Sequence, residues 1–269
     1  MWYSLHGYIH DYKALDVYLK HDFEQFIKQT KLEKFFFIRY WLGGPHVRLR
    51  FKCKEENYKI IKECFADSIR EFLKYYEVNL VDKYSFYDNI SIGMEGVHHT
   101  YWCKHGSVVE IDYNPEYDRY GGRDSMSDSE DVFCESSKMA LKLNKLDFTK
   151  RIILGFDLIY LSFERLDNRK TAIENYRDFW RNYAVNSNIK KDQSFRLKYY
   201  TKRLNELRVT SLRNNKLYSE YINSLEENGI FNEYSLLMSH VHMTNNRLGI
   251  SPSLEYELAD NLLSVIVSQ

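Results

Sequence analysis

A turn between two strand-like runs places the strongest constraint on what this chain can fold into. Residues 35–41 are largely aromatic or β-branched, and the Gly-Gly-Pro sequence at residues 43–45 cannot continue such a run. Residues 46–52 then alternate in character, and alternate side chains of a strand point to opposite faces of a sheet. The pattern predicts two faces, one packed with Val47, Leu49 and Phe51, and one basic with His46, Arg48 and Arg50.

The rest of the first half follows the order of a ferredoxin-like unit. Residues 2–9 suit a first strand, and residues 11–31 carry apolar side chains at helical spacing. The two strands around the turn follow, and then a long amphipathic helix at residues 55–79. Residues 84–110 are less regular and are expected to contribute two strands. Strand, helix, strand pair, helix and strand in this order predict a ferredoxin-like α+β sheet.

The second half is expected to be helical. Residues 125–131 are acidic and polar, and they are expected to start a helix with Ser127 or Asp128 as its N-cap. A seam near residue 125 separates the two halves, but no linker marks separate domains. We therefore expect an α+β fold in which residues 1–269 form one compact domain. The expected helices lie at residues 129–143, 147–166, 171–184, 193–207, 216–226, 231–246 and 253–268.

The composition disfavours several classes of protein. With 38 basic and 38 acidic side chains in 269 residues, the chain has no electrostatic footprint for bulk nucleic-acid binding. The four cysteines include no Cys-x-x-Cys pair, which favours free thiols in a reducing compartment. The sequence shows no signal peptide and no apolar run of about 20 residues, so we expect a cytoplasmic protein. It also has no P-loop, dinucleotide-binding or nucleophile-elbow motif.

A polar stretch bracketed by tyrosines, residues 113–122, follows a strand expected at residues 108–113. Glu116 and Arg119 are three residues apart, where side chains meet on a helical turn. The glycines at residues 121–122 then allow a ligand to approach the backbone closely. The pair is either part of a site or an ordinary surface ion pair, which contributes at most about 1 kcal/mol.

Two further stretches carry cationic side chains. Arg48 and Arg50 are costly to bury unpaired, so they must face solvent, pair with acids, or bind an anion such as a carboxylate. On the helix expected at residues 231–246, His240 and His242 point in different directions, whereas Asn246 shares a face with His242. A histidine near arginines suits a general acid or base, although the same residue type also serves structural roles.

A metal site is disfavoured. Residues 98–105 contain three histidines and a cysteine, which suit zinc by residue type. Their spacing matches no familiar ligand pattern, and no second pair is evident. We therefore expect neither a metal nor another cofactor.

Together, the three cationic stretches resemble the C-terminal domain of lantibiotic dehydratases, also called the thiopeptide-type bacteriocin biosynthesis domain. The resemblance rests on residues 36–51, on residues 115–122 and on the pattern His242-x-x-x-Asn246-Arg247-Leu248-Gly249. The stretches fall in the family's order, and the resemblance spans nearly the whole chain. Each motif alone is weak, but the ordered set is specific.

The resemblance implies a lyase reaction. In this family a large N-terminal region esterifies Ser or Thr of a precursor peptide with glutamate from glutamyl-tRNA. The C-terminal domain then eliminates glutamate and leaves dehydroalanine or dehydrobutyrine. This chain has no room for the first activity, so it resembles the stand-alone elimination subunit of a split dehydratase. The implied partners are a precursor peptide and a separate glutamylating subunit; direct tRNA binding is not expected, and a homodimer is left open.

The resemblance also implies roles for individual residues. Arg48, Arg50 and Arg119 would hold the glutamyl carboxylate and developing negative charge, although which strand arginine is the key one stays open. His242 would move the proton, and Glu116 would orient Arg119 or share proton transfer. His240 competes with His242, because the doubled Asn245-Asn246 leaves the alignment uncertain by a residue. The substrate-binding candidates are His46, Asn246 and Arg247, and the three stretches are expected to meet around one site.

Two other functions remain as alternatives. Pyridine-forming cycloaddition enzymes of thiopeptide pathways are divergent members of the same family and join two dehydroalanines into a ring. The Glu, Arg, Arg and His set favours elimination, because cycloaddition expels no glutamate. The third alternative is a non-catalytic scaffold that binds a precursor peptide or a partner enzyme.

Overall fold

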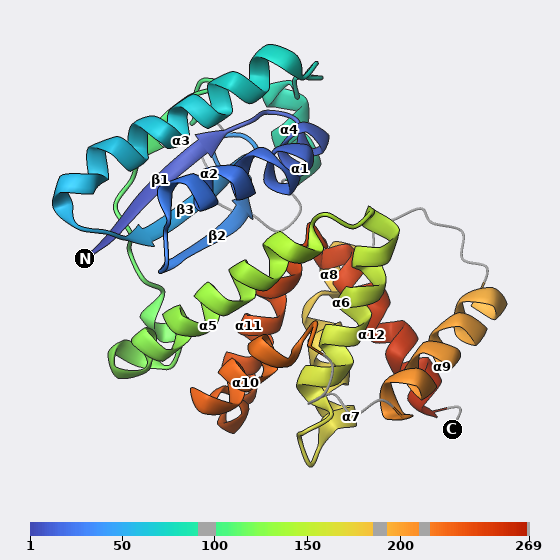
Figure 1. Ribbon diagram of the computed structural model, residues 1–269. Coiled ribbons are helices and arrows are strands. Elements are labelled where there is room, and N and C mark those ends of the chain that lie inside the picture. Colours follow the sequence, from blue (N-terminus) through green and yellow to red (C-terminus); the bar gives the residue numbers. More distant parts are fainter. Residues whose placement is uncertain (91–100, 185–192, 210–215, 268–269) are drawn as a thin grey trace. The chain divides into compact units, whose positions relative to one another are not determined.

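The chain divides into two compact units, Met1–Pro115 and Glu116–Gln269. The computed structural model describes residues 1–90, 101–184, 193–209 and 216–267 (Figure 1). The first unit carries the sheet, and the described residues of the second are helices and their connections. The expected α+β class is therefore confirmed, with a boundary earlier than the expected seam near residue 125. That the whole chain acts as one domain stays a prediction.

The first unit contains a four-stranded antiparallel sheet in the order β2-β3-β1-β4. The strands are β1 (Trp2–Tyr8), β2 (Phe35–Tyr40), β3 (His46–Lys52) and β4 (Val108–Glu110). The helices between them are α1 (Tyr12–Lys20), α2 (Asp22–Thr30), α3 (Glu55–Tyr75) and α4 (Lys83–Ile90). In the described part of the chain, two helices separate β1 from β2, and two more separate β3 from β4. The ferredoxin-like order is confirmed.

Helix ends in this unit differ from the predicted ones. The run at residues 11–31 is two helices, because His21 between them leaves helical geometry with φ −125° and ψ −66°. Residues 84–110 were expected to give two strands, but they begin within α4 and end in the short β4. Asp82 explains α4, since its carboxylate accepts from the backbone N–H of Ser85 at 2.9 Å and caps the helix start. Residues 91–100 lie outside the described residues.

The packed face of the sheet lies against α2 and α3. Val47, Leu49 and Phe51 are fully buried, as the alternation in β3 predicts. Gly7 of β1 lets α3 lie directly on the strand, because a Cβ atom there would be 2.4 Å from Ile69 Cδ1. Aromatic rings between α2, α3 and the sheet complete this core, including Phe23, Phe26, Phe37 and Phe65.

The second unit is a helical bundle in which α12 packs against α6, α7, α8 and α9, and α11 packs against α5. Its elements are η1 (Tyr117–Arg119), α5 (Gly122–Leu143), α6 (Phe148–Phe163), α7 (Arg169–Phe179), α8 (Arg181–Ala184), α9 (Gln193–Val209), α10 (Ser219–Glu227), η3 (Ile230–Asn232), α11 (Tyr234–Arg247) and α12 (Pro252–Val267). The expected N-cap at Ser127 or Asp128 is wrong, because α5 already begins at Gly122. Gly121 and Gly122, with φ of 77° and 90°, turn the chain into this helix.

His240 of α11 belongs to the core of the helical unit. It is 1% exposed and lies 5.4 Å from the ring of Tyr120 and 5.1 Å from that of Phe133. Its Nε2 shares a hydrogen bond with Ser129 Oγ at 3.2 Å. Burial, reinforced by the charges of Arg247 and Arg119, lowers the pKa of His240 to about 3. The imidazole is therefore uncharged at neutral pH in the folded protein.

The close packing at Gly7 predicts a steric effect with a specific partner. Gly7→Ala should lower the free energy of unfolding by about 1–3 kcal/mol, because the added methyl overlaps Ile69. Ile69→Val alone should cost about 0.5–1.5 kcal/mol, but it removes the overlapping Cδ1 atom. Denaturant titration of the double variant should therefore show partial rescue. Strictly additive losses would contradict this packing.

The burial of His240 predicts acid sensitivity. The folded pKa of about 3 lies below the unfolded value of about 6.5, so the unfolded state binds more protons between them. Stability from this residue is complete above pH 6.5 and falls as the pH drops, by up to about 1.4 kcal/mol per pH unit. His240→Leu should flatten the fall in unfolding free energy between pH 6.5 and 4. Replacing the exposed His21 with Leu is the control, and equal slopes in wild type and His240→Leu would contradict the assignment.

Candidate functional site

The basic face predicted for β3 is present in the sheet unit. His46, Arg48 and Arg50 share one face of the strand, and the antiparallel register places three residues of β1 opposite them. The opposite residues are Tyr8, His6 and Ser4, in that order. The face therefore combines two arginines with a row of hydroxyl and imidazole groups.

His46 does not contribute a positive charge to this face. It is fully buried, its Nδ1 donates to the carbonyl of Gly44 at 2.7 Å, and its Nε2 accepts from Arg48 Nε at 3.3 Å. Its ring lies 4.4 Å from that of Tyr8. Burial is the main reason that the pKa of His46 falls to about 3, and the neighbouring arginines lower it further. The prediction of three basic groups is wrong for His46, which instead positions Arg48 as a neutral acceptor.

Aromatic rings orient both arginines. The guanidinium carbon of Arg48 lies 3.3 Å from the ring centroid of Tyr40. That of Arg50 lies 5.8 Å from the ring of Phe36 and 5.4 Å from the ring of Tyr113. A ring attracts a cation through its π-face but carries no net negative charge. Guanidinium groups held in this way suit the recognition of a carboxylate.

In the helical unit, the Glu116 stretch and the α11 stretch meet. Glu116 Oε2 and Arg119 Nη1 are 3.2 Å apart, and their side chains are 64% and 36% exposed. An ion pair this exposed adds little stability. Arg119 also donates from Nε to Ser239 Oγ on α11 at 3.3 Å. The arginine is therefore held at the start of this unit against the helix that carries both candidate histidines.

His242 is the more accessible of these two histidines. Its side chain is 15% exposed, whereas His240 lies in the core. His242 lies three positions after Ser239, the partner of Arg119, so the two share a face of α11. Nδ1 of His242 lies 2.8 Å from Oε1 of Glu255, and the imidazole ring lies 4.3 Å from the ring of Trp180. The geometry favours His242 over His240 as the candidate acid or base.

The remaining two candidates on α11 differ in burial. Asn246 is half-buried one helical turn beyond His242. Arg247 is 1% exposed, and its Nε donates to Ser137 Oγ at 2.9 Å. Burial lowers the pKa of Arg247 to about 10. Arg247 therefore belongs to the core beside α5, and a role for it in substrate binding stays a prediction.

Glu255 contacts a candidate site residue, and the sequence pattern did not single it out. It lies in the first turn of α12, is fully buried, and contacts His242 with one oxygen. The other oxygen accepts a hydrogen bond from the hydroxyl of Tyr176 on α7. The available signal was weak: an acidic residue near the start of the helix that follows the histidine helix.

Metal sites, thiols and membrane-spanning helices can be examined in the described residues. These residues contain no group of three or more His, Cys, Asp or Glu side chains that suits a metal ion. His98 and His99 lie outside the described part. The four cysteines are all described and form no disulfide. In the same part of the chain, no helix has the length and apolar character needed to cross a membrane.

Comparisons with known proteins identify the family to which this chain belongs. The family model described as "Lantibiotic biosynthesis dehydratase C-term" matches residues 2–266. The nisin biosynthesis protein NisB of Lactococcus lactis subsp. lactis is 27% identical over 256 residues, which cover 87% of this chain. The chain spans only 22% of the length of that relative.

Solved structures share the fold at low sequence identity. The pyridine synthase TbtD from thiomuracin biosynthesis matches with a TM-score of 0.68 and 15% identity, over 99% of this chain and 98% of that one. The tRNA-dependent lantibiotic dehydratase MibB from Microbispora sp. 107891 matches with a TM-score of 0.58 and 15% identity, over 99% of this chain and 28% of that one. TsrL matches with a TM-score of 0.54 and 13% identity, over 99% of this chain and 95% of that one.

At such identities the structural matches show the fold alone. The family match is independent of them and covers nearly every residue. This chain therefore belongs to the lantibiotic biosynthesis dehydratase C-terminal family and is linked through it to the biosynthesis of ribosomally made, modified peptides.

Proposed function

We propose that the protein eliminates glutamate from glutamylated Ser or Thr residues of a ribosomal precursor peptide. The products are dehydroalanine or dehydrobutyrine and free glutamate. One observation carries the proposal: His242, bonded through Nδ1 to a buried carboxylate, shares a helix face with the residue that binds Arg119. This contact pattern supports a base on α11 with the cation of Arg119 bonded to the same face of that helix.

The proposed reaction assigns each group a task. The Nε2 atom of His242 removes the Cα proton, and the electron pair of the broken C–H bond is held as an enolate of the peptide carbonyl. This pair then forms the Cα=Cβ double bond as the Cβ–O bond breaks, and the electron pair of the Cβ–O bond leaves with the glutamate carboxylate. Arg119 stabilises negative charge that develops in the transition state, and Glu116 orients Arg119 through their ion pair.

The sheet unit would contribute to substrate binding. Arg48 and Arg50 are the proposed contacts for the glutamyl carboxylate, since guanidinium groups bind carboxylates in two-point geometry. His46 acts through Arg48, because it accepts a hydrogen bond from Arg48 Nε. Asn246 on α11 is proposed to contact the peptide. That these residues act on one substrate together with Arg119 and His242 is part of the proposal.

The proposal also names partners. The substrate is a precursor peptide, and glutamate would be attached by a separate subunit that uses glutamyl-tRNA. A cytoplasmic location follows from this dependence on tRNA. NisB is a nisin biosynthesis protein and MibB is a tRNA-dependent lantibiotic dehydratase, which agrees with a peptide substrate.

A second function has one observation in its favour. The pyridine synthase TbtD matches this chain over 98% of its length with a TM-score of 0.68, whereas the match to MibB covers 28% of that chain at 0.58. A pyridine-forming cycloaddition is therefore the alternative. It expels no glutamate, so it gives no reason for a base and several arginines that suit a carboxylate leaving group.

Elimination predicts a mass change that depends on two side chains. Incubation of the protein with a glutamylated precursor peptide should release glutamate, which mass spectrometry follows directly. Arg119→Ala and His242→Ala should each slow this release by about 100-fold or more, as expected for a charge stabiliser and a general base. Arg70→Ala is the matched control, because Arg70 and Asp67 form another exposed pair three residues apart. The control should keep a rate within about twofold of wild type.

Two results would replace the proposal with an alternative. If the glutamyl ester survives while a peptide with two dehydroalanines cyclises, the protein is a cycloaddition enzyme. If the protein binds the peptide with equal affinity in all variants and changes no mass, it is a scaffold.

A further inference from the structure

We propose that Glu255, supported by Tyr176, is a positioning residue that fixes the tautomer of His242 so that Nε2 carries the reactive lone pair. This inference rests on the proposed function, in which His242 removes a proton. The inference goes beyond the proposed function because it assigns two further residues, Glu255 and Tyr176, to the proton-transfer machinery. Neither residue belongs to the cationic stretches on which the family resemblance depends.

Two hydrogen bonds link Tyr176, Glu255 and His242 in that order, and this chain of three residues is called the relay below. A carboxylate can only accept, so the contact of 2.8 Å between Glu255 Oε1 and His242 Nδ1 requires the hydrogen to reside on Nδ1. In a neutral imidazole the other nitrogen then holds the lone pair. Tyr176 donates its hydroxyl hydrogen to Oε2 of the same carboxylate. Both oxygens of Glu255 are therefore engaged.

Burial makes this arrangement costly unless each contact is kept. Glu255 and Tyr176 are both fully buried, and an ionised carboxylate inside a protein is tolerated only when paired or hydrogen-bonded. Burial, followed by the charge of Glu255, raises the pKa of Tyr176 well above its ordinary value. The hydroxyl thus stays protonated and remains a donor. Trp180 covers the imidazole of His242 at 4.3 Å and excludes water from that side.

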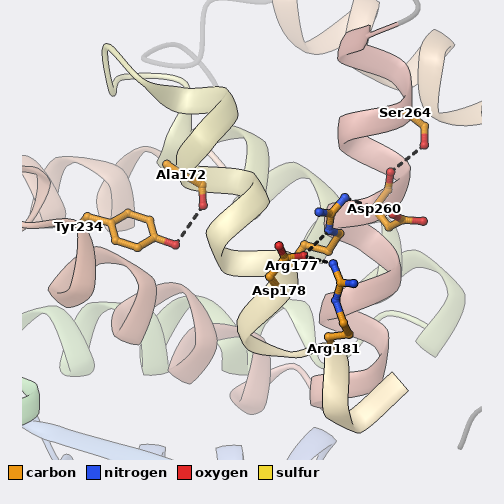
Figure 2. A network of polar contacts seen from close by, with 7 residues as sticks. All are labelled: Ala172, Arg177, Asp178, Arg181, Tyr234, Asp260 and Ser264. Carbon is orange, nitrogen blue, oxygen red and sulfur yellow. Dashed lines mark hydrogen bonds and ion pairs between the residues drawn. The ribbon is translucent and has the colours of Figure 1, made fainter. Parts of the chain in front are cut away.

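The three helices that carry the relay are tied together by separate contacts (Figure 2). The hydroxyl of Tyr234, at the start of α11, donates to the carbonyl of Ala172 on α7 at 3.0 Å. Arg177 is next to Tyr176 on α7, and its Nη1 atom lies 3.7 Å from Oδ1 of Asp260 on α12. These contacts hold α7 against both other helices independently of the relay. Such support keeps catalytic groups within the narrow tolerance that proton transfer needs.

The relay has a defined effect on the reaction. When Nε2 takes the Cα proton, the imidazole becomes a cation, and the carboxylate on its far side stabilises that charge. The same logic operates where a buried acid orients a catalytic histidine in hydrolases. Loss of the carboxylate should therefore lower kcat while leaving peptide binding almost intact.

The test combines kinetics with a spectroscopic readout. In protein labelled with 15N-histidine, NMR should show the neutral His242 ring with hydrogen on Nδ1, assigned by its loss in His242→Ala. Glu255→Gln should change the tautomer signature and lower kcat for glutamate release by at least about tenfold, with KM within about twofold. Tyr176→Phe, which keeps the carboxylate, should give a smaller loss of kcat and serves as a second variant if Glu255→Gln does not fold.

A matched control exists in the same unit. Asp157 on α6 is also a fully buried carboxylate that accepts from a tyrosine hydroxyl, that of Tyr218 at 2.7 Å, and it pairs with Arg203 instead of a histidine. Asp157→Asn should lower stability without changing the His242 tautomer. Thermal unfolding of each variant separates loss of fold from loss of the relay.

The outcomes distinguish the relay from the proposed function. Hydrogen on Nε2 in the wild type, or an unchanged tautomer and kcat in Glu255→Gln and Tyr176→Phe, would overturn the relay. A relay signature in a protein that releases no glutamate would refute elimination and leave the tautomer assignment standing. Elimination that is abolished by His242→Ala but unaffected by Glu255→Gln would support the proposed function and refute the positioning role.

Discussion

The polar contacts between α11 and α5 determine how the helical unit presents its candidate base. His240 and Arg247 of α11 are buried, and each meets a serine hydroxyl of α5. A buried imidazole and a buried guanidinium are costly without such partners. A shift of α11 along its axis would break these hydrogen bonds inside the core and is therefore unfavourable. The helix is thereby fixed in register and rotation. With this side in the core, His242 lies on the side that meets Glu255 and Trp180.

In the sheet unit, the neutral imidazole of His46 likewise fixes the position of a candidate site residue. His46 accepts from Arg48 and donates to the turn at Gly44, so the turn, the histidine and the arginine form one chain of contacts. Burial keeps the pKa of His46 low, so this acceptor persists throughout the neutral range. The positive charge of the face is thus concentrated in the arginines. A protonated histidine there would repel Arg48 and lose its acceptor atom.

The sequence was informative where local pattern decides structure. The alternation of Val47, Leu49 and Phe51 gave the orientation of β3, and the spacing of His240 and His242 gave their divergence on α11. Local reasoning failed at α4, where the cap at Asp82 outweighs a less regular pattern, and at the start of α5, where glycines rather than Ser127 turn the chain. Glu255 was not predictable, because its contact with His242 depends on how two helices pack. The charge state of His46 likewise depends on burial, which no spacing encodes.

The position of Trp180 against His242 has a consequence for observation rather than for chemistry. An indole ring whose centroid lies 4.3 Å from that of an imidazole senses whether the imidazole is neutral or a cation, because the cation interacts strongly with the π-face and quenches its fluorescence. Trp180 is itself largely shielded from solvent, at 6% exposure, so bulk quenchers contribute little to its signal. Once the other three tryptophans of the chain are replaced, Trp180 can therefore serve as an optical reporter of protonation at His242.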